Sequence, residues 1–448
     1  MKACIGFGTF SVSLLTALAS AASTPPSSKT HINNPVIPRP DLQAHPFPPT
    51  KPFPKSSARQ ASKTCFVSPK PVGQDDAPAI LKAFHDCNNG GTVVLDKAYT
   101  IASPLDLTFL NAVDVAITGT VKFTDDIPYW TEHTFKYAYQ NASTWWRFGG
   151  KDVNIYGAGK GVIDGNGQAW YDEFVVNQVL RRPILFVLDG LHGGSVTGLK
   201  LRNTPFWFNL IANSSDVLVS DIDMSAESTS ANEAKNTDGW DTLRSDNIVI
   251  QSSTIQNNDD CVSFKPNSTN ILVQNLLCRD SRGISVGSLG QYPGQYDIVE
   301  NVYVYNTLMR NASAGARIKV WPSGHVNFQA ALSGGGGSGY VKNVTFDSYH
   351  NVNNDWAIEV NQCYGTKDLK FCHENPTNIV LSDITFKNIY GTTSKQHDPL
   401  VGTIRCSHPS RCHNIQAHNV TLTQPSGKKP EWVCENVDRK LLDINCTA

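Results

Sequence analysis

A short phrase of alternating apolar residues recurs along most of the chain and constrains its fold more than any other feature. Each copy opens with a polar residue and Asn or Asp, as in "DNIVIQ" and "TNILVQ". Alternating β-branched residues predict strands rather than helices. The leading apolar residues of nine copies are Val153, Val196, Val217, Ile248, Ile271, Val302, Val344, Ile379 and Ile415. One strand group per roughly 20–30 residues is typical of a solenoid, in which each coil packs on its neighbours.

We therefore predict an all-β fold, a right-handed parallel β-helix. A sandwich with Greek-key turns is the alternative, and it ranks lower because hairpin signals are sparse. The Asn residues that open the strands are expected to stack at the coil corners and bond to backbone, a structural role.

A second strand follows each first strand at a nearly constant offset. Its first apolar residues are Val262, Ile284, Ile318 and Ile358, which lie 13 to 16 residues after the corresponding first strands. If these second strands stack, their flanking residues share one outer face, with about 4.8 Å between neighbouring strands. The charged residues beside them are Asp238, Asp259, Asp260, Arg282, Arg317, Lys319 and Glu359. We thus predict three carboxylates followed by cations along one face.

Asp259 and Asp260 are adjacent, so a regular strand would point them to opposite sides. The stretch "QNNDD" has a turn-like composition, and a bend there would let both carboxylates reach the same face. Clustered carboxylates raise one another's pKa, which supplies an acid and a base in one place. Glycoside hydrolysis needs such a pair. A calcium site or a hydrogen-bonded turn is the alternative interpretation.

The role of the cations on this face has two interpretations. Arg317 and Lys319 lie two residues apart in "GARIKVW", so they share a strand face. The guanidinium of Arg317 and the ammonium of Lys319 would suit binding of a sugar carboxylate. Alternatively they neutralise the aspartates, and the two roles are compatible. Arg282 either binds substrate or serves as a structural counter-ion. Among the tryptophans, Trp240 and Trp321 flank the charged motifs, and core positions are favoured over sugar contacts.

Composition excludes some classes of partner. Charged residues make up 17% of the 448 residues and the formal net charge is -1, so no basic stripe suggests a nucleic-acid partner. Residues 1–22 are expected to be a cleaved secretory signal and residues 23–62 a Pro-rich leader or linker with little structure. Residues 63–448 then form a single β-helix domain. No later apolar run is long enough for a membrane span, and we expect a secreted monomer.

Ten cysteines remain once Cys4 leaves with the signal. An even number in a secreted chain predicts disulfides, with sequence neighbours as plausible pairs. Cys261 and Cys278 are expected to pair, because a zinc site would need further Cys or His at short spacing. Glycosylation sequons begin at Asn141, Asn213, Asn267, Asn311, Asn343, Asn419 and Asn445, and secretion makes their use plausible.

Four motifs, "NTDG" at 236–239, "NDD" at 258–260, "RGISVGSLG" at 282–290 and "RIK" at 317–319, occur in an order that resembles the polygalacturonase family of pectin-degrading glycoside hydrolases. The resemblance covers about residues 65–446, and the longer strings are most similar to fungal exopolygalacturonases. It implies a pectin-lyase-like β-helix, a pectic polysaccharide substrate, no cofactor or metal, and inversion of configuration. Asp259 would be the general acid, and Asp238 and Asp260 would hold and activate water. Arg317 and Lys319 would bind the galacturonate carboxylate, and Asn236 lies in the substrate-binding "NTDG" motif.

Two features depart from the family pattern. The family has histidine where this chain has Arg282, and a permanent cation there would favour a lower pH optimum, lower activity or an altered substrate. A one-coil separation of about 5 Å is a spacing generally assigned to retaining enzymes.

Exo action requires one end of the substrate site to be closed. Insertions at "SAESTSANEAK", "GQYPGQYD" and "HVNFQAALSGGGGSG" are the expected walls. The predicted function is exo-hydrolysis of polygalacturonate. The alternatives are a rhamnogalacturonan or xylogalacturonan hydrolase, a calcium-dependent pectate lyase, and a non-catalytic pectin-binding solenoid.

Overall fold

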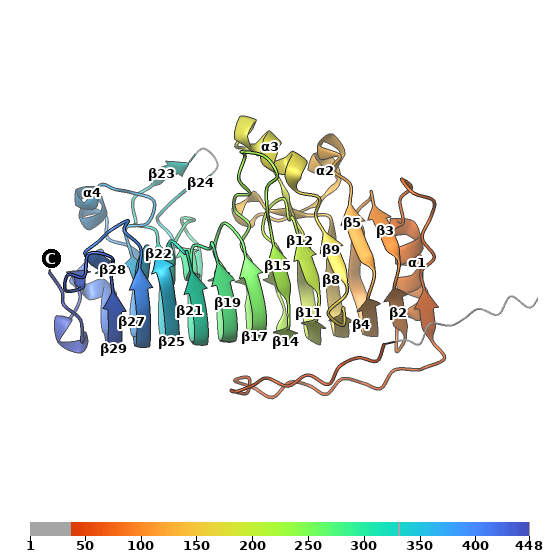
Figure 1. The fold of residues 1–448 in the computed structure, drawn as a ribbon, viewed down its shortest axis with the longest axis horizontal. Helices are drawn as coiled ribbons and strands as arrows, with labels where there is room; N and C mark the ends of the chain where they lie inside the picture. The colour runs from red at the N-terminus through yellow and green to blue at the C-terminus, as the bar shows by residue number, and fades with distance from the viewer. Residues whose placement is uncertain (1–36, 330–331, 448) are drawn as a thin grey trace, which may run out of the picture. The chain divides into compact units, whose positions relative to one another are not determined.

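The computed structural model describes residues 37–329 and 332–447. Most of their strands belong to one 25-stranded sheet, in which each strand pairs in parallel with a strand of the next coil. Figure 1 shows the coils side by side along the solenoid. Antiparallel pairs within the described residues are confined to two small sheets. The predicted parallel β-helix is confirmed, and the Greek-key sandwich is wrong.

The strands stack in columns, of which the long column carries the repeat. It consists of β1 (Thr64–Phe66), β2 (Thr92–Leu95), β4 (Leu105–Ile117), β8 (Trp146–Tyr156), β11 (Phe186–Thr197), β14 (Ser215–Ser220), β17 (Ser245–Gln256), β19 (Ser268–Arg279), β21 (Tyr296–Arg310), β25 (Ser338–Asn354), β27 (Asn378–Thr393) and β29 (Cys412–Thr423). A further column is formed by β3 (Ala98–Ile101), β5 (Thr120–Phe123), β9 (Val162–Asp164), β12 (Lys200–Arg202) and β15 (Asp223–Ser225).

The short column consists of the predicted second strands. It comprises β13 (Asn209–Ala212), β16 (Trp240–Leu243), β18 (Val262–Phe264), β20 (Ile284–Leu289), β22 (Ala314–Val320), β26 (Trp356–Asn361), β28 (Leu400–Arg405) and β30 (Glu431–Glu435). The two small sheets are β10 (Pro183–Ile184), β7 (Ser143–Thr144) and β6 (Phe135–Lys136), and β23 (Val326–Gln329) with β24 (Leu332–Gly334).

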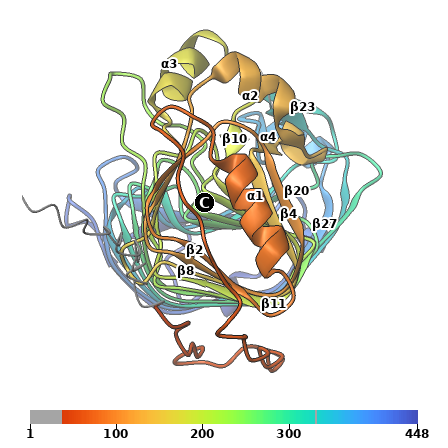
Figure 2. The same cartoon turned by 90° about the vertical axis from the view of Figure 1, so that its right-hand side faces the viewer.

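Helices occupy connections and one end. They are α1 (Ala77–Cys87), α2 (Ile127–His133), α3 (Gln168–Val176) and α4 (Leu369–Glu374), with the 3-10 helices η1 (Tyr139–Asn141), η2 (Pro409–Arg411) and η3 (Arg439–Leu441). Helix α1 lies across the N-terminal end of the coils (Figure 2) and buries Ile80 and Phe84. It therefore shields the first coil's apolar interior from water. No helix among the described residues has the length and hydropathy to cross a bilayer.

The register of the long column follows the repeat over five coils. Val217, Ile248, Ile271, Val302 and Val344 stack in turn, and their side chains are buried. The next partner of Val344 is Ile384 and not the predicted Ile379. The predicted position of Val196 in this column is also out of register, because the residue that pairs with Val217 is Gly194.

The short column departs from prediction at one strand. Val262 pairs with Ile284, but Ile284 pairs with Ala316, and Ala316 with Ile358. The predicted partner Ile318 lies two residues further along. Because side chains alternate with a period of two, this shift keeps Ile318 in the core and its neighbours on the outer face.

Asparagines with left-handed backbone stack at a coil corner. Asn270, Asn301 and Asn343 have φ of 56°, 57° and 54°. The amide of Asn301 donates to Asn270 at 3.1 Å, and that of Asn343 donates to Asn301 at 2.8 Å. The stacking was predicted, but these side chains bond to one another rather than to backbone.

Five disulfides join consecutive cysteines, the pairing that the sequence makes plausible, and the expected Cys261–Cys278 bond is among them. They are Cys65–Cys87, Cys261–Cys278, Cys363–Cys372, Cys406–Cys412 and Cys434–Cys446. Cys4 and the predicted signal peptide lie outside the described residues.

Residues 37–60, here called the strap, contain no helix or strand and lie against the long column (Figures 1 and 2). The amide of Gln274 accepts from the backbone of Phe47 at 3.1 Å and donates to it at 3.0 Å. The guanidinium of Arg59 lies 3.0 Å from both Asp114 and Asp152. The strap thus satisfies polar groups of the solenoid, which its leader-like composition does not indicate.

Candidate active site

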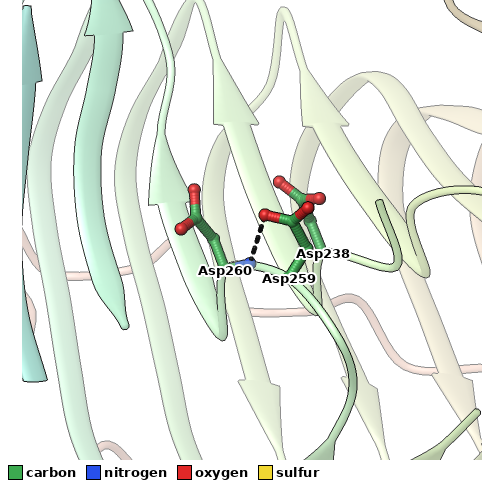
Figure 3. A group of neighbouring side chains, drawn as sticks. All are labelled: Asp238, Asp259 and Asp260. Atoms are coloured by element: carbon green, nitrogen blue, oxygen red, sulfur yellow. Dashed lines mark hydrogen bonds between the residues drawn. The ribbon is translucent and has the colours of Figure 1, made fainter. Parts of the chain in front are cut away.

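Three buried carboxylates converge on the outer face of the short column. Asp238 lies just before β16, and Asp259 and Asp260 just before β18. One oxygen from each lies within 4.8 Å of the others, and the residues are 4%, 7% and 1% exposed. Figure 3 shows them pointing to the same side. Two successive coils therefore place the group, as the stacking of second strands predicts.

A bend at 258–259 allows the adjacent pair to face one way. The backbone N–H of Asp260 donates to the Asp259 carboxylate at 3.0 Å (Figure 3). The amide of Asn236 donates to the same carboxylate at 3.3 Å, and its oxygen accepts from Arg182 at 2.8 Å. Asn236, which sequence reasoning assigns to the substrate, therefore bonds to protein on both sides.

Asp260 is surrounded by donors. Lys319 Nζ lies 2.5 Å from one of its oxygens, and the Ser285 hydroxyl donates to the other at 2.8 Å. Arg317 lies 3.8 Å away. Burial favours the neutral acid, but the charges of Lys319 and Arg317 outweigh it and lower the pKa of Asp260 to about 2. Asp260 is thus an ionised carboxylate through the acid and neutral range.

Asp238, in contrast to Asp260, tends to hold a proton. Burial, followed by the negative charge of Asp259, raises the pKa of Asp238 to about 7, although Lys265 opposes the shift. Lys265 Nζ lies 3.3 Å from the Asp238 carboxylate. In the free protein, therefore, the group holds one firmly ionised carboxylate and a second with a tendency to stay protonated.

The predicted cations differ in what they contact. Arg317 Nε lies 2.7 Å from Glu359, and Lys319 bonds to Asp260. Arg282 lies 3.6 Å from Asp259, and its side chain is 46% exposed. Trp240 and Trp321 are fully buried, so neither offers a ring to a sugar.

Sequence reasoning missed three buried charges beside this group: Lys265, Asp241 and Arg182. Lys265 lies 3.5 Å from Asp241 as well as close to Asp238. Asp241 and Lys265 could have been found from alternation, since Asp241 follows the core residue Trp240 and Lys265 follows the core residue Phe264. Arg182 comes from a distant connection, and no local pattern marks it.

The three carboxylates are the kind of oxygen ligands that Ca²⁺ prefers, the alternative that the sequence leaves open. The ammonium groups of Lys319 and Lys265 already lie against Asp260 and Asp238. Resident cations thus compensate the charge that a divalent ion would need, and the residues present fit such an ion poorly.

Comparison with known proteins agrees with this geometry. Residues 96–446 match the model described as "Glycosyl hydrolases family 28". The chain belongs to this family of glycoside hydrolases.

Two curated relatives carry more specific names. "Exopolygalacturonase X-2" of Emericella nidulans is 52% identical over 408 residues, covering 91% of each chain. "Probable exopolygalacturonase X" of Neosartorya fischeri is 56% identical over 404 residues, covering 90% of this chain and 92% of the relative.

Solved structures show the same architecture. The endo-xylogalacturonan hydrolase of Aspergillus tubingensis is 35% identical, with a TM-score of 0.77, and the match covers 86% of this chain and 99% of that one. A polygalacturonase of Erwinia carotovora is 19% identical, with a TM-score of 0.64 and coverage of 89% and 100%. The latter supports the fold alone.

Proposed function

We propose that this protein is a secreted, exo-acting pectin hydrolase that removes terminal galacturonate from α-1,4-linked polygalacturonate. The observation that carries the proposal is the buried group of three aspartates, which is flanked by cations. This group lies beside a side of the short column that other residues close. The names of the relatives at 52–56% identity support the same substrate and the exo mode.

The closed side is formed by residues 135–144, here called the plug. Val187, Leu210 and Leu243 belong to an apolar cluster separate from the core, and Tyr137 and Tyr139 of the plug pack against it. The outer face on the N-terminal side of the aspartates is therefore covered by apolar side chains. A polysaccharide lying along the short column would have to end there.

The plug also reaches the opposite edge of the column. The backbone N–H of Gln140 donates to the Tyr292 hydroxyl at 3.0 Å, and its side chain donates to Gln291 at 2.9 Å. The plug precedes β8, whereas Gln291 and Tyr292 follow β20, so this contact spans the width of the column. Of the insertions expected to act as walls, "GQYPGQYD" contributes to this bridge, and the plug itself was not foreseen.

The proposed chemistry assigns one role to each aspartate. Asp259 donates a proton to the glycosidic oxygen as the bond from C1 to that oxygen breaks. Asp238 and Asp260 orient a water and accept its proton as its oxygen bonds to C1. The proton then returns to Asp259 through solvent. Inversion is proposed on family membership, because the short carboxylate spacing by itself would suggest retention.

Recognition of acidic sugar residues is proposed for Arg282, Arg317 and Lys319. Arg317 and Lys319 are held in place by Glu359 and Asp260, so their charge is positioned before substrate arrives. Arg282 is the most exposed of the three.

A xylogalacturonan hydrolase is the second candidate, because the solved structure at 35% identity is that of an endo-xylogalacturonan hydrolase. Both candidate substrates share a galacturonate backbone. A comparison of polygalacturonate with the branched xylogalacturonan therefore separates the two candidate functions.

The first experiment sizes the products from polygalacturonate and xylogalacturonan by chromatography. We expect galacturonic acid as the earliest product from polygalacturonate, and a loss of about 10²-fold or more in Asp259→Asn, since general acid catalysis contributes on this scale. Early mixed oligomers would contradict exo action. Faster release from xylogalacturonan would favour the second candidate, and no release from either would favour a binding solenoid.

A further inference from the structure

Lys265 and Asp241 form a buried ion pair directly beside the proposed catalytic group. Asp241 lies in β16 and Lys265 follows β18, and they are 0% and 4% exposed. Lys265 Nζ lies 3.3 Å from Asp238 and 3.5 Å from Asp241. The chemistry proposed above gives this pair no task.

The surroundings of the pair are buried. Neither carboxylate oxygen of Asp241 has a hydrogen-bond partner among the described residues. The Lys265 ammonium lies 5.0 Å from the ring centroid of Trp207. The plug's Tyr139 has a hydroxyl that is also buried and unpartnered among those residues. In such a site a charge acts more strongly than in water.

Asp238 and Asp259 compete for one proton, because Asp260 is held ionised by Lys319. Donation by Asp259 requires the proton to lie on Asp259 and Asp238 to be ionised. Burial and the negative charge of Asp259 oppose this by raising the pKa of Asp238 to about 7. Something must therefore favour the ionised form of Asp238.

The groups that face Asp238 decide its ionisation. The charged groups acting on it are Asp259, Asp260, Asp241, Lys265, Lys319 and Arg182. Of the cations, Lys265 forms the ion pair with Asp238, whereas Lys319 bonds to Asp260. Burial raises the pKa of Asp241 well above its ordinary value, which weakens its competition with Asp238 for the charge of Lys265.

We propose that Lys265 is a positioning residue that favours the ionised form of Asp238 and thereby the arrangement with the proton on Asp259. This inference rests on the proposed hydrolysis of polygalacturonate.

The test is the pH dependence of kcat/KM for Lys265→Met relative to the parent. We expect kcat/KM to fall about tenfold or more near about pH 5. Removing the adjacent positive charge should raise the pKa of Asp238 by about one unit or more. The loss should shrink toward alkaline pH, where Asp238 ionises without help. Lys265→Arg should restore much of the acid-range activity. A loss by the same factor at every pH would overturn the proposal and indicate a structural role.

Asp241→Asn is the matched control. It alters the same buried pair but leaves the charge of Lys265 beside Asp238, so its kcat/KM relative to the parent should vary less across the acid range than that of Lys265→Met. If Lys265→Met does not fold, the double variant Lys265→Met/Asp241→Asn removes both charges and should show the same pH-dependent loss. A parent inactive on polygalacturonate refutes the proposed function, whereas an active parent with a pH-independent loss refutes this inference alone.

Discussion

At the scale of single residues, the cations around the aspartates are not equivalent. Arg317 and Lys319 are held by carboxylates of the protein, at 2.7 and 2.5 Å. Arg282, which replaces the histidine of the family pattern, is 46% exposed. Of the three cations, Arg282 therefore has the side chain most open to solvent.

Replacing Arg282 should weaken substrate binding more than it affects folding. We expect Arg282→Met to raise KM for polygalacturonate by about 10–100-fold, the equivalent of one charge-assisted hydrogen bond. Arg282→His should recover binding only below about pH 6.5, where histidine is charged. Steady-state kinetics and the unfolding temperature measure both effects.

Arg310→Met is the control for this variant, because Arg310 is also exposed but belongs to β21 in the long column. An equal rise of KM in both variants, or an unchanged KM in Arg282→Met, would contradict a binding role for Arg282.

At the scale of elements, the strap and the plug contact different columns and have different roles. The plug covers part of the short column beside the aspartates, whereas the strap contacts the long column. Asp114 is a buried member of the long column whose carboxylate meets two arginines of the strap, Arg39 and Arg59, each at 3.0 Å. We infer that the strap stabilises the coils without taking part in the chemistry.

The strap offers a buried and an exposed ion pair for comparison. Arg59 has a side chain 8% exposed, whereas Lys51 is 58% exposed and pairs with Asp246 at 2.7 Å. We expect Arg59→Met to lower the free energy of unfolding by about 2 kcal/mol, because Asp114 and Asp152 each lose a charged donor although Arg39 still pairs with Asp114.

Lys51→Met should cost about 0–1 kcal/mol, as for other surface pairs. Denaturant unfolding measures both, and kcat/KM should stay at the parent value in each. Equal stability losses, or a loss of activity confined to Arg59→Met at full folding, would contradict this division of roles.

At the scale of the whole molecule, the buried aspartates link stability to pH. The pKa of Asp238 rises to about 7 on folding, so its contribution is complete below about pH 4, the unfolded value, and is lost as the pH rises through about 7. The pKa of Asp260 falls to about 2, so its contribution is present above about pH 4 and is lost as the pH falls toward about 2.

The protein should therefore unfold at a higher temperature near about pH 5 than near about pH 8. Asp238 alone would account for at most about 3 kcal/mol of this difference, since about two pH units separate pH 5 from its pKa of about 7. Thermal scans at one heating rate should show that Asp238→Asn removes much of the decline, whereas Asp260→Asn leaves it. Stability that rises from pH 5 to pH 8 in the parent would contradict the buried, protonation-prone state of Asp238.

The amino-acid sequence alone determined the coil and the faces of its strands. The alternation around Ile248 and Ile271 identifies the strands, and a period of two assigns inner and outer residues without further information. Since the second strands follow at nearly fixed offsets, the meeting of Asp238 with Asp259 and Asp260 could also be predicted.

Only the tertiary structure decided what surrounds those aspartates. The distance in sequence between coils depends on loop length, so alternation cannot tell that Ala316 rather than Ile318 stacks on Ile284. Nor can it tell that Tyr139 and Gln140, over a hundred residues from Asp259, cover the outer face. Lys265 belongs to the same class, because its role depends on burial and on two carboxylates at 3.3 and 3.5 Å. Burial and the charges of neighbouring coils set a side chain's ionisation, and both arise only when the coils pack.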